Sequence, residues 1–157
     1  MGEVLRKRLQ QSRFGDPVQE AVLNVLVAAG HLRDRMERAL GEEDITLGQY
    51  NVLRILRGAH PGGHPRCEIA RRMLERAPDV TRLIDRLESR GLVERTRSEE
   101  DKRLSITRVT RRGLELLERV QPGVESAHRE LAARLSAREA RELSRLCERL
   151  YGEEEAP

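Results

Sequence analysis

One stretch of the chain decides the fold: Asp79-Val80-Thr81-Arg82-Leu83-Ile84-Asp85-Arg86-Leu87-Glu88-Ser89-Arg90-Gly91-Leu92-Val93-Glu94-Arg95. Its apolar residues recur at helical spacing and predict a helix with one buried stripe, formed by Val80, Leu83, Ile84 and Leu87. Asp79, Arg82 and Arg86 share the outward face of that helix. Gly91 stands where a glycine in the left-handed conformation ends a helix, and Leu92 can then contact Leu87. The stretch therefore predicts an amphipathic helix that displays arginines.

A shorter helix precedes this one, and an extended segment follows it. The inner face expected for the shorter helix consists of Ile69, Ala70, Met73 and Leu74. A turn at Glu75–Ala77 then leads to Pro78, which suits the first position of a helix. After Leu92 the apolar period changes to about two, and residues 93–97 and 104–109 flank a polar tip at 98–103. These features predict a helix-turn-helix followed by a β-hairpin with a long tip.

Longer helices are expected on both sides of this core. Apolar residues spaced by 3 and 4 predict a helix over about 17–40, and additional ones widen its stripe beyond what one packing partner covers: Leu23, Leu26 and Val27. Thr46 and Gln49 form a capping box, so the next helix should begin near Leu47. Thr110 can cap a long helix, and Ser136 opens the last one. We expect part of the wide stripe to face a second chain.

Composition restricts the class of protein. The 157 residues include 30 basic and 27 acidic ones, a net charge of +3, and 38% are apolar. This fits one globular domain and excludes both a disordered polymer and a membrane span. The N-terminus lacks an apolar signal region, so we expect a cytoplasmic location. Between Arg66 and Arg112 there are 14 basic and 9 acidic residues, a net +5, whereas the remainder carries −2. The positive charge is concentrated around the predicted helix-turn-helix.

Three motifs in order carry a resemblance to a known family. They are the stretch 79–95, then Asp101-Lys102-Arg103, then Thr110-Arg111-Arg112-Gly113. Together they resemble the MarR family of bacterial transcriptional regulators, with Val109 and Lys102 as small departures from its pattern. The resemblance implies a mainly α fold with a small β-hairpin wing. This is a winged helix-turn-helix with N- and C-terminal dimerisation helices. It also implies a homodimer that binds double-stranded DNA at a pseudo-palindromic operator.

The resemblance divides the chain into regions. Residues 1–16 are expected to form a flexible basic arm, and residues 17–150 the family domain. Its DNA-binding core would span about 46–110 and its dimerisation helices about 17–40 and 111–150. Residues 151–157 would form an acidic tail.

The expected DNA-binding residues lie on the second helix of the motif and on the wing: Asp79, Thr81, Arg82, Arg86, Arg95, Arg97, Lys102 and Arg103. A bidentate arginine contact to guanine discriminates by about 1–3 kcal/mol, and we assign base reading to Arg82. Thr81 and Arg86 suit phosphates. Arg103 suits a narrow minor groove, where the negative potential is enhanced. Asp101 is expected to orient a wing arginine.

Other polar residues of this region have simpler interpretations. Arg90 and Arg108 are expected to be surface arginines. Asp85 and Glu88 could pair with arginines of their own helix. An arginine-rich helix face can also be a merely solvated one, so spacing alone leaves both interpretations open for Arg82 and Arg86.

The resemblance also implies a small aromatic or lipophilic acid as an effector. Candidate pocket residues are His31, Arg33, Tyr50 and Arg54, each of which could equally serve packing or the surface. His60, His64 and Cys67 invite a metal interpretation, but the glycines and prolines between them prevent a shared face, and a closed zinc site needs four ligands. We predict no metal and no cofactor. Cys67 is expected to be a buried or half-buried structural thiol.

The sequence thus predicts a DNA-binding transcriptional regulator, an effector-released repressor acting as a homodimer. The alternative is a winged helix used as a protein-interaction module. An enzyme has little support, since the chain shows no Ser/His/Asp set, phosphate-binding glycine loop or paired carboxylates.

Overall fold

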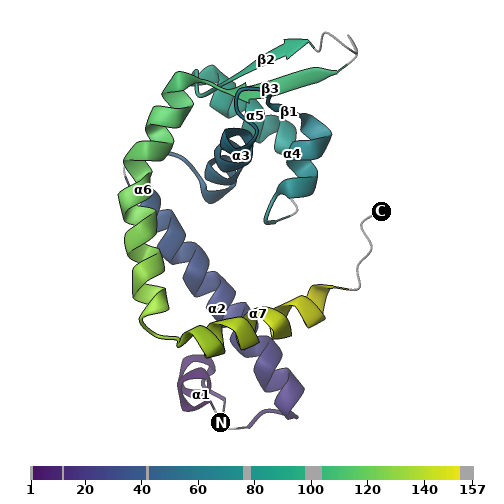
Figure 1. Ribbon diagram of the computed structural model, residues 1–157. Coiled ribbons are helices and arrows are strands. Elements are labelled where there is room, and N and C mark those ends of the chain that lie inside the picture. The colour runs from purple at the N-terminus through teal and green to yellow at the C-terminus, as the bar shows by residue number, and fades with distance from the viewer. Residues whose placement is uncertain (1, 12, 42, 76–78, 98–103, 153–157) are drawn as a thin grey trace.

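The computed structural model describes residues 2–11, 13–41, 43–75, 79–97 and 104–152. Helices and a small sheet form a lobe at one end of two long helices that lie side by side (Figure 1). The long helices are α2 (Pro17–Leu40) and α6 (Arg111–Ala132), which we call the stalk. They approach closely at Gly123, where an added Cβ would lie 2.4 Å from the carbonyl oxygen of Ala39. A residue without a side chain is therefore required at this crossing.

Two more helices, α1 (Glu3–Leu9) and α7 (Ala137–Tyr151), lie at the end of the stalk far from the lobe (Figure 1). The helix α1 corrects the expectation of a flexible arm over residues 1–16. Its Leu5 is buried, with 2% of its surface exposed, and Gly2 N–H donates to Glu20 Oε1 of α2 at 2.6 Å. One buried leucine and one hydrogen bond thus hold α1 against α2, although the polar composition of this segment suggested no such contacts.

The lobe contains α3 (Leu47–Gly58), α4 (Arg66–Arg72) and α5 (Val80–Ser89), with a three-stranded antiparallel sheet in the order β1-β3-β2. Strands β2 (Val93–Arg97) and β3 (Ser105–Val109) form the predicted hairpin, with Val93 opposite Val109. The sequence did not predict β1 (His64–Pro65), which pairs with β3. A two-residue strand is too short to show a period, and its prolines and glycines resemble a loop.

Most element boundaries follow the local signals. Thr46 and Ser136 both complete capping boxes. At the end of α5, Leu92 N–H donates to Leu87 O at 2.9 Å and Gly91, with φ +68°, donates to Glu88 O at 2.8 Å. This is the predicted Schellman ending. The start of α5 is a correction. The helix begins at Val80 with Asp79 as its N-cap, rather than at Pro78, which lies outside the described residues.

The motif Thr110-x-x-Gly113 joins the lobe to α6. Thr110 Oγ1 accepts from Gly113 N–H at 3.1 Å and donates to Gly91 O at 2.7 Å. An added Cβ on Gly113 would lie 2.2 Å from Leu92 O. The threonine caps α6 while the glycine lets this helix pack directly on the turn that ends α5.

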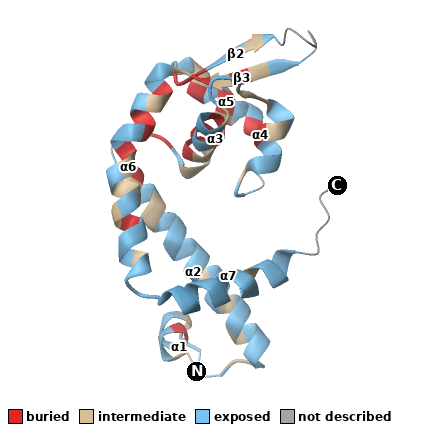
Figure 2. Cartoon of the chain, viewed as in Figure 1, coloured by how far each residue is buried: buried red, intermediate tan, exposed pale blue. Residues whose placement is uncertain are grey.

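Burial is uneven along the molecule, and the buried residues gather in the lobe and the adjoining half of α6 (Figure 2). The core includes Leu53, Leu56, Ile84, Leu87 and Leu117. For α4, the predicted inner face is half right: Ile69 is buried and Met73 packs against the core. Ala70 and Leu74, by contrast, are exposed. Leu74 lies beyond Arg72, where α4 ends and the chain leaves the helical path.

The far end of the stalk shows the opposite pattern. Helix α7 buries none of its residues (Figure 2). Large apolar side chains are exposed along α2 and α7: Val18, Val22, Leu26, Leu32, Leu143, Leu146 and Leu150. Within the described part of the chain, no helix is long and apolar enough to cross a membrane.

Candidate DNA-binding surface

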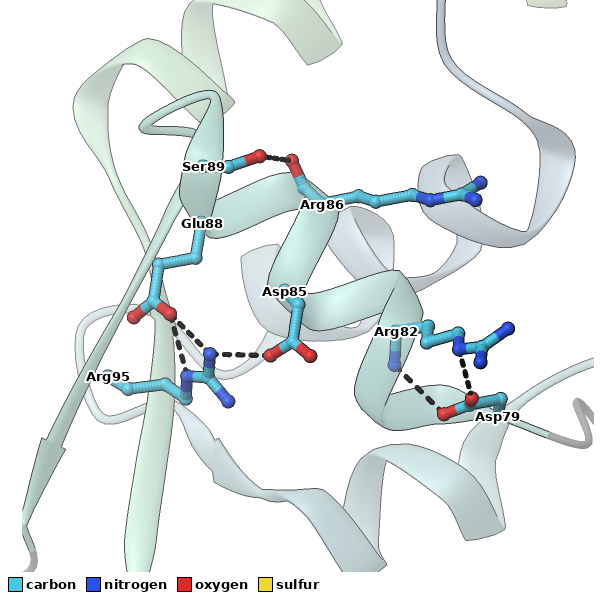
Figure 3. A network of polar contacts seen from close by, with 7 residues as sticks. All are labelled: Asp79, Arg82, Asp85, Arg86, Glu88, Ser89 and Arg95. Carbon is cyan, nitrogen blue, oxygen red and sulfur yellow. Dashed lines mark hydrogen bonds and ion pairs between the residues drawn. The ribbon is translucent and has the colours of Figure 1, made fainter.

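Asp79 and Arg82 form a pair at the start of α5 (Figure 3). One carboxylate oxygen of Asp79 accepts from Arg82 N–H at 3.0 Å and so caps the helix. The other lies 2.9 Å from Arg82 Nε. The Arg82 side chain is 80% exposed. Asp79 therefore holds the side of the guanidinium, while its terminal nitrogens extend into solvent.

Arg86 lies one turn further along α5 and extends away from Arg95 (Figure 3). It is exposed and forms no ion pair with another described residue. A polar pocket of about 330 Å³ lies between the C-terminal half of α5 and the start of α3, and Arg86, Arg90 and Thr46 line it. Thr81 is also exposed. The N-terminal and middle turns of α5 thus present two arginines to solvent.

Arg95 on β2 forms contacts within the lobe that the sequence did not predict. Its Nη2 lies 2.6 Å from Asp85 Oδ1, and its Nε donates to Glu88 Oε2 at 2.9 Å (Figure 3). The hydrogen bonds that Arg95 donates to Glu88, and then those to Asp85, raise the pKa of this guanidinium, and Arg95 in turn lowers the pKa of Glu88. The carboxylates that could have paired within α5 hold the hairpin against it instead. A positioning role suits Arg95 better than contact with DNA.

The remaining wing residues divide into two groups. Arg97 is exposed at the end of β2, whereas Asp101, Lys102 and Arg103 lie outside the described residues. Arg108 corrects its assignment as a surface arginine. It donates to Gly62 O at 3.1 Å and to Thr96 Oγ1 at 3.2 Å, across the sheet and onto the segment before β1. The contact with Gly62 was not foreseen, because β1 was not predicted.

Arg90 is a second correction. From the C-cap position of α5 it donates to the carbonyl oxygens of Glu43 and Asp44, in the loop between α2 and α3. A sequence signal did exist, since Arg90 directly precedes the helix-ending Gly91, where a long side chain can turn back over the lobe. The identity of its partners came only from the tertiary structure.

The proposed effector residues do not gather at one site. Arg33 lines a pocket of about 260 Å³ and forms a 2.6 Å ion pair with Glu75. The rest of the lining is partly apolar: Glu37, Thr46, Leu47, Gly48, Asn51, Met73 and Leu74. Tyr50 is buried, and the Arg54 guanidinium lies 6.0 Å from the centre of its ring. His31 is exposed on α2. Only Arg33 of the four lines this pocket.

The thiol and metal interpretations can be placed as well. Cys67 is exposed on α4, which corrects the expectation of a buried thiol, and Cys147 is half-buried. Cys67 is exposed because it lies near the start of α4, on a different side of the helix from Ile69, which faces the core. In the described ranges, no three His, Cys, Asp or Glu side chains are grouped so that they could hold a metal ion.

Two helices joined by a turn, with a hairpin packed on the second helix, define a winged helix-turn-helix. Residues 45–105 match the model of the MarR family. A MarR transcription factor from Planctomyces limnophilus has a similar structure, with 40% sequence identity and a TM-score of 0.66. The match covers 87% of this chain and 98% of that one. The chain belongs to the MarR family, whose members are DNA-binding transcriptional regulators and not enzymes.

More distant relatives add detail about the family. The transcriptional repressor IacR of Pseudomonas putida is 27% identical over 122 residues, 78% of this chain and 72% of that protein. MepR of S. aureus, solved as a complex with DNA, shares the fold with 21% identity and a TM-score of 0.73, over 82% of this chain and 93% of that one. Other proteins of the same fold were solved with 2,4-dichlorophenol and with p-coumaroyl-CoA.

Proposed function

We propose that this protein is a sequence-specific repressor that binds a pseudo-palindromic operator as a homodimer. The observation that carries the proposal is that the two faces of α5 have different surroundings. Its inner stripe is buried and Asp85 and Glu88 hold the wing through Arg95, while Arg82 and Arg86 extend into solvent. The helix is fixed from behind and presents arginines in front, as a helix entering a major groove must.

The residues of α5 suit different parts of DNA. Because Asp79 holds Arg82 Nε, the terminal nitrogens of Arg82 remain for the O6 and N7 acceptors of a guanine. Thr81 and Arg86 suit phosphates, which fix the register without reading sequence. On the wing, Arg97, Lys102 and Arg103 would follow the backbone or the minor groove, with Asp101 orienting one of these bases.

Exposed apolar side chains support the homodimer. A helix with the composition of α7 does not remain folded in water without a partner for its apolar stripe, and α2 exposes a second such stripe at the same end of the stalk. A second copy of the chain would cover both. Each copy would then carry one α5 toward one half-site.

We place release by an effector at the pocket beside Arg33. It offers apolar contacts from Leu47 and Met73, and a small aromatic or lipophilic acid would take the Arg33 guanidinium over from Glu75. The pocket lies against the turn that leads into α5, so a ligand there could change how α5 is presented. Relatives that hold small organic molecules and a relative named as a repressor support this part of the proposal.

The test begins with selection of duplexes from genomic fragments or from a random library by the wild-type protein. The affinity of the selected duplex is then measured at increasing salt. A DNA-binding protein should lose affinity steeply, because binding releases counterions from the phosphates. If no duplex is enriched, or if affinity does not change with salt, the protein is a winged helix of the interaction type instead.

A further inference from the structure

The loop between α2 and α3 joins α5 to the stalk through one glutamate. Arg119 of α6 forms two parallel hydrogen bonds to the Glu43 carboxylate, from Nε to Oε1 at 2.6 Å and from Nη2 to Oε2 at 3.0 Å. This bidentate arrangement is the strongest geometry for such a pair. The hydrogen bonds and charge of Arg119, together with the charge of Arg90, hold the pKa of Glu43 below its usual value.

The backbone of the same glutamate is held from the other side. Arg90 Nη2 donates to Glu43 O at 2.8 Å, and its Nη1 donates to Asp44 O. Arg90 is the C-cap residue of α5, and Asp44 has the unusual φ of +50°. Two arginines from two helices thus immobilise a loop that has no regular structure. We call Arg119, Glu43 and Arg90 the loop clamp.

A second attachment lies near the opposite end of α5, in the turn that precedes this helix. Glu75, in the turn between α4 and α5, forms its 2.6 Å ion pair with Arg33 of α2. Leu74 N–H in the same turn donates to Asn51 Oδ1 of α3 at 2.8 Å. Helix α5 is therefore held to α6 at its C-terminal end, and the turn before its N-terminal end is held to α2. Two separated attachments fix an orientation, which one attachment cannot do.

We propose that the loop clamp positions α5 relative to the stalk and thereby sets the half-site spacing that the dimer accepts. The inference rests on the proposed function, a homodimer on two half-sites. Half-sites of such operators lie about 34–36 Å apart, one turn of DNA, so a lobe that pivots on its stalk can satisfy one half-site while missing the other. Arg119, Glu43 and Arg90 act here as positioning residues, without touching DNA.

The experiment measures the affinity of the full-length protein for the selected duplex and for versions with one or two base pairs added or removed between the half-sites. Glu43→Gln and Arg119→Gln each remove the charge pair with little change in size. Arg145→Gln is the matched control, since Arg145 makes a similar two-bonded pair with Glu142 on α7, far from the lobe. Circular dichroism and sedimentation check that each variant is folded and dimeric.

We expect the wild type and Arg145→Gln to bind one spacing best. Glu43→Gln should weaken binding at that spacing by about two- to fivefold, the order of one lost ion pair that is partly exposed to solvent. It should weaken binding to duplexes with other spacings less, so that the difference in affinity between the spacings becomes smaller. Arg119→Gln should behave alike, and the double variant no worse than either single one, because the pair acts as a unit.

Two results would overturn the inference while leaving the proposed function intact. One is an unchanged spacing profile in both variants, and the other is an equal loss at every spacing, which indicates a purely structural role. Failure of the wild type to bind any duplex would instead overturn the proposed function, and the inference with it.

Discussion

The lobe and the far end of the stalk differ in how they are stabilised. The lobe encloses Val52, Leu53, Leu56 and Leu87, none of which is accessible to water. The far end exposes the leucines of α7 and the valines of α2 (Figure 2). The lobe encloses a hydrophobic core, whereas the apolar side chains at the far end are covered on one side only or not at all. The lobe is therefore stabilised by its own packing, whereas the far end leaves an apolar surface that the proposed second copy would cover.

The largest expected effect comes from the core of the lobe. Leu53→Ala should lower the free energy of unfolding by about 2–5 kcal/mol, because the cavity lies among fully buried neighbours. Chemical denaturation measures it. If the two regions differ as described, Leu150→Ala on α7 should cost much less at protein concentrations low enough to keep the chain monomeric, where Leu150 is exposed. Equal costs for the two leucines would remove the distinction.

The second effect concerns the exposed stripe of α7. Leu146→Glu places a charge in the middle of the stripe and should shift the protein from dimer to monomer in sedimentation experiments. Arg141→Glu changes the charge more but lies on the other side of the helix, and it should leave the dimer intact. The circular dichroism of the lobe should survive in both variants. A dimer that persists in Leu146→Glu would place the interface elsewhere.

The smallest effect concerns the contact of the wing with α5. Arg95 lowers the pKa of Glu88, so this pair stabilises the fold above the ordinary carboxyl pKa of 4.5, and the contribution is lost as pH falls through the lowered value. Arg95→Gln should increase hydrogen exchange in β2 and β3 at neutral pH. It should also reduce the loss of stability below pH 4.5. A variant with wild-type exchange in the hairpin would show that the contact does not hold the wing.

The sequence predicted the lobe well where its signals are local. Capping boxes, the glycine at position 91 and the period change after Leu92 each depend on neighbours in the chain, and the structure confirms them. It failed for Arg90 and Arg108, whose partners Glu43 and Gly62 lie far away in sequence. It also failed for Arg95, because its partners on α5 come close only when the hairpin packs against that helix. Arginines look alike in a sequence, and only the tertiary structure separates those that hold the lobe together from those that face solvent.

The same limit applies to the effector pocket. Its apolar lining comes from α3 and from the turn after α4, and only Arg33 was among the residues suggested by the sequence. A pocket formed where several elements meet has no period of its own. The two leucines and the methionine that line it, Leu47, Leu74 and Met73, are ordinary core-forming residue types, so their role could not be separated from packing.

The central claim is that the front of α5 reads sequence through Arg82 while Arg86 only contacts the backbone. The most direct test measures the affinities of wild type, Arg82→Ala and Arg86→Ala for the selected duplex and for every single-base change in one half-site. Arg82→Ala should lose the preference at one position, where discrimination is about 1–3 kcal/mol in the wild type. Arg86→Ala should weaken all duplexes by the same factor. Equal weakening of every duplex by Arg82→Ala would contradict the account.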